Sequence, residues 1–321
     1  MMKLEKKSIL IAVDGSQQSF DAVRYVALML PEGQARIHLL HVLNLIPDTF
    51  WDLGNGLDIL NQTTDIKTWE KQQRKRIDVF MHESRQFLLQ RGFSEQVITV
   101  IVKERQIGIA RDIVREARKG YHALVLGRHG LGNLKGLLFG SIANKLVSHL
   151  HQVPLWVVGG SLNPDKILIA MDASDGAIRA MEYVVDIFGG NHPELLLFHV
   201  TRGISQPQTG YEGPAVFHED RYWLEKAEKE FHMAEKRMKT LFKQSVARLK
   251  SKGADVSRIN TKIVPGVYSR AGAIFGEAQE GGYGTIVVGR RGLSRVEEFV
   301  MGRVSSKVLQ LAEEMAVWVI H

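Results

Sequence analysis

Two glycine-rich segments have the composition expected of a phosphate-binding loop. They share the spacing Gly-x2-Gly-x9-Gly, at Gly127, Gly130 and Gly140 in the first and at Gly289, Gly292 and Gly302 in the second. Glycine lets the backbone turn sharply and approach a ligand closely. Each third glycine precedes a helical pattern, and the free N–H groups and dipole of a helix start favour a phosphate. Taken alone, the spacing is also compatible with a turn that binds nothing.

The residue after the third glycine differs between the two segments. Ser141 adds a hydroxyl to the first segment, whereas Arg303 puts a bulky cation at the same place in the second. Arg303 could fill the phosphate position, or it could hold an anion through its guanidinium group. Ser305 could partly replace the missing hydroxyl, but Glu297 and Glu298 add negative charge that disfavours a phosphate. We expect an impaired or altered site in the second segment.

Aspartates and strand ends supply the other candidate groups. Asp14 and Asp172 each follow an apolar run that is typical of a buried strand. Either could accept hydrogen bonds from ribose hydroxyls, and either could instead cap the helix that follows. Val42 and Val200 end the second apolar run of each half, where backbone groups could contact an adenine edge.

The sequence contains an internal repeat, which indicates where the strands and helices around the candidate residues lie. SILIAVD at 8–14 returns as KILIAMD at 166–172, and Trp156-Val157 returns as Trp318-Val319. A short Gly- and Pro-containing stretch at 159–164 separates the copies. We therefore predict two domains, residues 1–160 and 161–321.

Each copy alternates strand and helix patterns. The expected strands cover 9–13, 37–43, 97–102, 123–126 and 155–158 in the first copy, and 167–171, 194–200, 258–264, 285–288 and 316–320 in the second. Polar insertions at about 44–65 and 201–220 precede a long helix in each copy. This order predicts an α/β fold of two doubly wound, mostly parallel sheets with helices on both faces. Ligands of such sheets bind beyond the carboxyl ends of the strands.

Composition excludes several classes of protein. The 321 residues contain no cysteine, which rules out disulfides, cysteine zinc sites and thiol catalysis. The sequence lacks the ~18 consecutive apolar residues of a membrane span and a signal peptide's apolar core, so we expect a soluble, cytoplasmic protein without a membrane partner. The net charge of +7 divides into +6 for residues 1–160 (21 Lys and Arg, 15 Asp and Glu) and +1 for the rest. Much of the excess falls on a predicted helix, so a nucleic-acid partner is not favoured.

The combination of motifs resembles the universal stress protein family. The order VDGS, HV, GRHG…GS and PLWVV is similar to one such domain, and MDAS, HV, GRRG…GR and AVWVI is similar to another. The chain thus resembles a tandem universal stress protein. The resemblance implies five-stranded parallel sheets of the adenine nucleotide alpha hydrolase-like type. It also implies ATP on the glycine loop in those members that bind it, and pairing of domains through their last strands.

The resemblance assigns nucleotide-binding roles residue by residue. Asp14 takes the ribose side, Val42 the adenine side through its backbone, and Arg128 could pair with an anion or point into water. The first domain's nucleotide-binding set is Asp14, Val42, Gly127, Arg128, Gly130, Gly140, Ser141, Ile142 and Ala143. A possible second site comprises Asp172, Val200, Gly289, Gly292, Gly302 and Arg303.

Three functions remain open on these observations. The first is a stress-response protein whose first domain binds ATP or another adenine nucleotide, possibly with Mg²⁺. The second is a scaffold or signalling module that needs no nucleotide. The third is a slow ATPase, but no catalytic residue or metal site can be named, and Asp14 is the carboxylate we would place near the ligand.

The last strands predict how the domains pack. Antiparallel pairing of 155–158 with 316–320 would cover two exposed sheet edges and make an internal pseudo-dimer. Trp156 and Trp318 lie in these strands, and we interpret them as interface or core aromatic residues. A further homodimer of chains is compatible with this arrangement.

Overall fold

The two halves of the chain contain the same succession of elements. The computed structural model describes residues 6–31, 33–44, 59–130, 140–160, 163–188, 191–202, 218–292 and 301–321. The first half consists of β1 (Lys7–Ala12), α1 (Gln17–Met29), β2 (Ala35–Leu43), α2 (Ile59–Gln90), β3 (Ile98–Glu104), α3 (Ile109–Ala117), β4 (Ala123–Gly127), α4 (Ser141–His149) and β5 (Leu155–Val158). The second consists of β6 (Lys166–Ala170), α5 (Asp175–Phe188), β7 (Glu194–Arg202), α6 (His218–Ser251), β8 (Ile259–Val267), α7 (Arg270–Glu280), β9 (Thr285–Gly289), α8 (Arg303–Leu311) and β10 (Ala316–Ile320).

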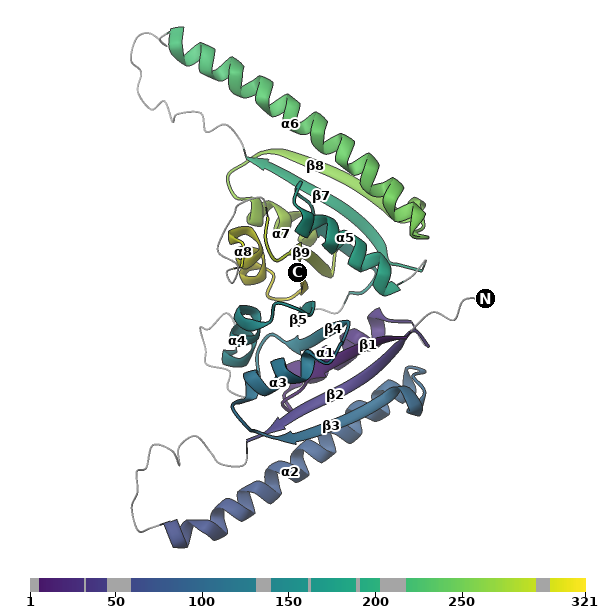
Figure 1. Ribbon diagram of the computed structural model, residues 1–321, viewed down its shortest axis with the longest axis vertical. Helices are drawn as coiled ribbons and strands as arrows, with labels where there is room; N and C mark the ends of the chain where they lie inside the picture. Colours follow the sequence, from purple (N-terminus) through teal and green to yellow (C-terminus); the bar gives the residue numbers. More distant parts are fainter. Residues whose placement is uncertain are drawn as a thin grey trace.

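All ten strands join one sheet, in the order β3-β2-β1-β4-β5-β10-β9-β6-β7-β8. The pairing is parallel within each half and antiparallel where β5 meets β10. This confirms the predicted α/β class and the predicted pairing of the last strands. The long helices α2 and α6 lie toward opposite ends of the molecule (Figure 1).

Burial explains why the central strands carry uninterrupted apolar runs. Every residue of β4, β5, β9 and β10 is buried, as expected for strands covered by helices on both faces. Helix α1 begins after Ser16, whose hydroxyl accepts a hydrogen bond from the backbone N–H of Ser19 and so caps the helix. Ala22, Val23 and Val26 of α1 lie in the core.

Tryptophans join the two halves. Trp156 of β5 and Trp318 of β10 are register partners, and their rings stack with centroids 3.8 Å apart. Both side chains have no exposed surface. The indole Nε1 of Trp318 donates to the hydroxyl of Tyr25, which lies 2.7 Å from the hydroxyl of Thr285. The prediction of interface aromatics is therefore confirmed.

The long helices begin within the segments expected to be polar insertions. Helix α2 starts at Ile59 and α6 at His218. The preceding residues 45–58 and 203–217 lie outside the described part of the chain. In the described residues no helix combines the length and apolar character of a membrane span.

Candidate functional site

A cavity of about 300 Å³ lies at the carboxyl ends of β1, β2 and β4 in the first half. Its wall is formed by these strand ends, by the start of α4, and by side chains of α2 and α3. The predicted nucleotide-binding residues all line it: Asp14, Val42, Gly127, Arg128, Gly130, Gly140, Ser141, Ile142 and Ala143. Residues far apart in the sequence thus meet at the edge where ligands of parallel sheets bind.

Asp14 stands directly against the glycine loop. Its Oδ1 accepts a hydrogen bond of 3.0 Å from the backbone N–H of Ser16, which orients the carboxylate. A Cβ atom at residue 130 would collide with Oδ2 of Asp14, so only glycine fits there without displacing the carboxylate. The expected proximity of the first-strand aspartate and the loop is present.

Gly127 has a packing role as well as a place in the cavity wall. A Cβ atom at this position would lie 2.6 Å from the carbonyl oxygen of Gln18 in α1. Glycine is therefore required for the close approach of α1 to the end of β4. Part of the loop's glycine spacing thus reflects helix packing, independently of any ligand.

The start of α4 lies at the cavity wall. Its N-cap residue is Gly140, which has no side chain to accept a hydrogen bond from the first turn. The first turn contains Ser141, Ile142 and Ala143, all of which line the cavity. The N–H groups of a first turn have no partner within their own helix, and the dipole is positive at this end. This wall can therefore accept an anion.

Arg128 does not point into water. It is only 2% exposed, and its guanidinium crosses to the second half. There Nη1 donates to the carbonyl oxygen of Leu309 at 2.7 Å and Nη2 to that of Ala312 at 2.6 Å, at the end of α8. Burial lowers the pKa of Arg128 to about 10, which still leaves the group charged at neutral pH. Its two Nη atoms bind helix-end carbonyls, so the expectation of a side chain that points into water is corrected.

Arg290 makes the reciprocal contact. Its Nη1 donates to the carbonyl oxygen of Leu150 at 3.0 Å and its Nη2 to that of Ser148 at 3.3 Å, at the end of α4. A cation near a helix C-terminus interacts favourably with the dipole and the last carbonyls. The arginine of each glycine segment therefore fastens one half of the molecule to the other.

His41 closes one side of the cavity by a backbone contact. Its Nδ1 lies 2.7 Å from the carbonyl oxygen of Val13. Burial lowers the pKa of His41, although this hydrogen bond opposes the shift. His199 repeats the contact with Met171 in the second half, also at 2.7 Å. The recurring histidine therefore ties the ends of the first two strands of each half.

Some cavity residues were not identified from the sequence. Trp69 and Gln73 of α2 and Ile109 and Ile113 of α3 also line the cavity. Trp69 belongs to a helical apolar pattern in the sequence, but such a pattern does not tell whether a residue packs on the sheet or lines a cavity. The 3.6-residue period of a helix marks its apolar face but does not separate core residues from cavity residues.

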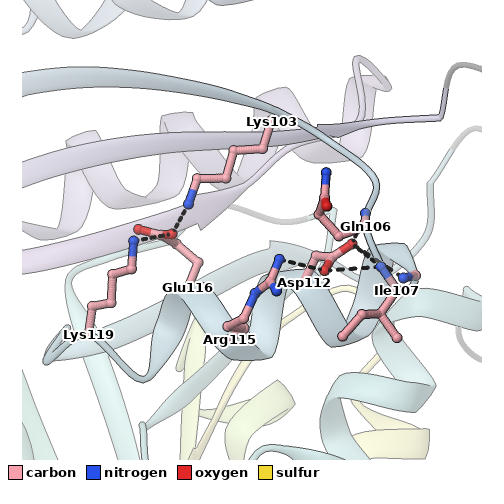
Figure 2. Close-up of polar contacts among 8 residues, drawn as sticks. Lys103, Gln106, Ile107, Asp112, Arg115, Glu116 and Lys119 are labelled. Carbon is pink, nitrogen blue, oxygen red and sulfur yellow. Dashed lines mark hydrogen bonds and ion pairs between the residues drawn. The ribbon is translucent and has the colours of Figure 1, made fainter.

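A buried carboxylate fixes the loop that leads into α3. Asp112 accepts hydrogen bonds from the backbone N–H groups of Gln106, Ile107 and Gly108 at 2.8, 3.2 and 3.3 Å (Figure 2). Arg115 adds an ion pair of 3.1 Å. Burial alone raises the pKa of Asp112, but these donors outweigh it and hold the pKa below its usual value. The β3–α3 loop is thereby fixed where Ile109 enters the cavity wall.

The second half retains the aspartate and the glycines. Asp172 accepts a hydrogen bond of 3.0 Å from the backbone N–H of Ser174 and another from its hydroxyl. A Cβ atom at Gly292 would lie 2.6 Å from Oδ2 of Asp172, and Gly302 is the N-cap of α8. Val200 is buried in β7, and a Cβ atom on Gly289 would press on the backbone of α5.

Two side chains distinguish this half. Arg303 is exposed as the first residue of α8. Ser305 is buried, and its hydroxyl donates to the carbonyl oxygen of Gly289 at 2.7 Å. The Ser305 hydroxyl is thus committed to the end of β9, which corrects the expectation that it could replace the missing phosphate contact. Glu297 and Glu298 lie outside the described residues.

Comparison with known proteins shows which family the chain belongs to. The model of the universal stress protein family matches residues 6–159 and again 164–321. The universal stress protein YxiE of Bacillus subtilis is 27% identical over 148 residues, which cover 46% of this chain and 93% of that protein. A universal stress protein of Mycolicibacterium smegmatis is 25% identical over 197 residues, 60% of this chain and 63% of that relative. A universal stress protein structure from Archaeoglobus fulgidus shares the fold across 100% of this chain and 99% of its own, with a TM-score of 0.57 and 20% identity. The chain therefore belongs to the universal stress protein family, and it carries two family domains in tandem.

Proposed function

We propose that the first domain binds an adenine nucleotide such as ATP, and that the second domain is impaired for this ligand. The family supports a role in the response to stress. The observation that carries the proposal is convergence: nine residues chosen from motif positions line one cavity, which ends at an uncapped helix start. A purely structural loop would not require them to surround a hollow.

The cavity offers a different contact to each part of a nucleotide. The phosphates belong at the start of α4, near Ser141, where backbone donors and the dipole favour negative charge. The ribose belongs beside Asp14, whose carboxylate can accept hydrogen bonds from hydroxyl groups. The adenine belongs against Val42 and the apolar side of the cavity, where Ile113 and Leu126 provide dispersion contacts.

The proposal concerns binding, with no reaction step. Among the described residues that line the cavity, Asp14 is the one carboxylate, and it is assigned to the ribose. Mg²⁺ usually keeps several waters and is bound by one or two carboxylates and the substrate's phosphates. Mg²⁺ would therefore enter with the phosphates, and Asp14 is the carboxylate that could reach its shell.

The second domain is expected to bind an adenine nucleotide poorly for two reasons. Arg303 replaces Ser141 at the start of the helix, so the small hydroxyl is lost. Ser305 replaces Ala143 and forms a hydrogen bond between the helix start and the end of β9. The Ser305 hydroxyl therefore occupies the position that Ala143 leaves without a polar group in the first domain.

A matched pair of glycine variants tests the proposal. ATP is titrated into the purified chain by calorimetry, and nucleotide released on denaturation is identified by mass spectrometry. Gly140→Val is expected to weaken ATP binding at least about tenfold, or ~1.4 kcal/mol, because the side chain enters the helix start. Gly302→Val makes the same change in the second domain and should leave the affinity unaltered.

A third variant transfers the second domain's residue to the first. Ser141→Arg should also weaken ATP binding while leaving the thermal unfolding midpoint close to that of the wild type. Unchanged affinity in both Gly140→Val and Ser141→Arg would overturn the assigned site. Two nucleotides bound per wild-type chain would overturn the assignment of impairment to the second domain.

A further inference from the structure

A groove between α3 and α4 adjoins the cavity and has a different character. Its volume is about 820 Å³. It shares Ile109, Ser141 and Ile142 with the cavity, so the two hollows meet at the start of α4. Side chains of Ile107 and Val114 contribute its apolar part. The groove extends the proposed phosphate end of the site along the outside of the domain.

Cations surround this groove. Arg111, Arg115 and Arg118 recur at intervals of four and three residues and therefore form one stripe along α3 and its end. Lys145 and His149 are four residues apart on α4. Arg105 completes the lining next to the end of β3, and no aspartate or glutamate is among the described residues that form the groove.

Most of this positive charge is not neutralised by the protein. Arg115 pairs with the buried Asp112, whose other partners are backbone N–H groups. Within the described ranges, no ion pair involves Arg111, Arg118 or Lys145, and these three side chains are exposed.

A neighbouring cluster behaves differently. Lys103 and Lys119 both contact the carboxylate of Glu116, which is only 4% exposed (Figure 2). These lysines therefore neutralise a buried acid and are not part of the groove. On the groove side of α3, Arg115 pairs with the buried Asp112, whereas Arg111 and Arg118 have no ion pair among the described residues.

The second domain shows that the fold does not require these cations. The buried residues Ala110, Ile113 and Ala117 of α3 correspond to Ala271, Ile274 and Ala278 of α7, each 161 residues later. At the same offset, the arginines at 111, 115 and 118 correspond to Gly272, Gly276 and Gln279. The apolar face of the helix is thus repeated, whereas the cationic face is present in α3 and absent from α7.

The shape and chemistry of the groove indicate a linear polyanion. At 1.5 Å per residue, the stripe from Arg111 to Arg118 extends about 10 Å, so one phosphate cannot contact all its cations. Guanidinium groups bind phosphate oxygens in pairs and with defined geometry. Single-stranded nucleic acids are usually held by aromatic stacking platforms as well, and the described lining contains no Phe, Tyr or Trp.

We propose that the groove between α3 and α4 of the first domain binds a linear phosphoanhydride chain, as found in inorganic polyphosphate. The same chemistry would suit a phosphate chain attached to a nucleotide in the adjoining cavity. Binding of the free chain does not rest on the proposed nucleotide function, because the groove has its own cations and its own apolar floor.

Charge-neutralising variants with a matched control test this proposal. Binding of inorganic polyphosphate to the full chain is measured by calorimetry at several salt concentrations. Arg111→Gln combined with Arg118→Gln removes two groove cations while keeping good helix formers. Lys236→Gln combined with Arg237→Gln removes the same charge from exposed positions of α6 in the second domain. Circular dichroism and the thermal midpoint verify that both variants are folded.

The expected result is selective loss. The groove variant should bind polyphosphate at least about tenfold more weakly, and the slope of log affinity against log salt should fall by about 1 to 2. The control should change affinity less than about twofold. Equal weakening in both variants, or absence of polyphosphate binding to the wild type, would overturn the proposal.

Two further arms identify the ligand and its location. Single-stranded RNA that binds more tightly than polyphosphate, with the same dependence on Arg111 and Arg118, would replace polyphosphate as the occupant and overturn the proposal. Gly140→Val should leave the affinity for free polyphosphate within about twofold of the wild type, because Gly140 lines the cavity and is not among the described residues that line the groove. Loss of polyphosphate binding in Gly140→Val would place the chain in the nucleotide cavity instead. Since Gly140→Val is expected to weaken ATP binding, measuring its affinities for ATP and for polyphosphate tests the two proposed sites separately.

Discussion

The two halves of this chain agree where they touch each other and differ at the helix start that follows the glycine loop. Trp156 and Trp318 stack across the central strands, and Arg128 and Arg290 exchange hydrogen bonds with opposite helix ends. At the start of the helix after the glycine loop, however, Ser141 has become Arg303. The comparison teaches that one repeated backbone can keep its interface duplicated while the residues at its helix starts diverge.

The divergence extends beyond a single residue. The first domain has Ala143 where the second has Ser305, and Asp112 where the second has Ala273. The second domain instead caps its helix α7 with Ser269, whose hydroxyl accepts from the backbone N–H of Gly272. The two domains thus stabilise the same loop–helix junction by different means. Only the first combines that junction with a cationic stripe.

Removal of a central tryptophan should have the largest effect. Trp156→Ala deletes a fully buried ring from the junction and should lower the free energy of unfolding by about 3–5 kcal/mol. Trp318→Ala should cost slightly more, by about 0.5–1.5 kcal/mol, because it also removes the donor to Tyr25. Urea unfolding of both variants measures the difference. Equal or smaller loss in Trp318→Ala would contradict a net contribution from that hydrogen bond.

The crossing arginines offer a second test of symmetry. Arg128→Met should destabilise the chain by about 2–3 kcal/mol, because two buried carbonyl groups at the end of α8 lose charged donors. Arg290→Met should cost less, about 1–2 kcal/mol, since its hydrogen bonds are longer. Urea unfolding curves give both values. An Arg128→Met variant as stable as the wild type that no longer binds ATP would reassign this side chain to the ligand.

Local sequence patterns predicted much of the fold because the apolar runs correspond to strands that are buried in the structure. The apolar runs of β4 and β9 predicted buried strands, because short-range periodicity and the repeat are visible in the sequence. The pairing of β5 with β10 followed from the resemblance to the family and from the need to cover two sheet edges. The nucleotide-binding set also came from the resemblance, and the structure brings its members to one cavity at the carboxyl ends of the strands.

Other features depend on contacts that a sequence does not display. Arg128 reaches Leu309 across 181 positions of the chain, and no local rule pairs those two residues. Asp112 binds backbone N–H groups, which every residue type except proline possesses, so its neighbours carry no signature. Trp69 faces the cavity because of how α2 is rotated on the sheet, which helical periodicity alone does not determine.

The buried Asp112 gives the first domain a pH dependence that the second domain lacks at the matching Ala273. The folded-state pKa of Asp112 lies below its value in the unfolded chain. Its contribution is therefore present above the unfolded pKa, near 4, and is lost as the pH falls through the folded pKa. Asp112→Asn should cost about 1–3 kcal/mol at neutral pH, and this difference from the wild type should shrink in acid. Urea unfolding at several pH values measures it, and a pH-independent difference would contradict a role for the charge.

The smallest effect should come from exchanging residues 143 and 305. Ser305→Ala removes one hydrogen bond, to the carbonyl oxygen of Gly289, and should lower the free energy of unfolding by about 1 kcal/mol. The reciprocal Ala143→Ser places a hydroxyl opposite Gly127 in the first domain, where it can make the same bond across the cavity wall. The variant should weaken ATP binding a fewfold, by about 1 kcal/mol, because the added hydroxyl occupies space at the start of α4. Urea unfolding and ATP calorimetry on the two variants test both directions. If Ala143→Ser bound ATP as tightly as the wild type, the hydrogen bond of Ser305 would not explain the difference between the domains, and Arg303 alone would have to account for it.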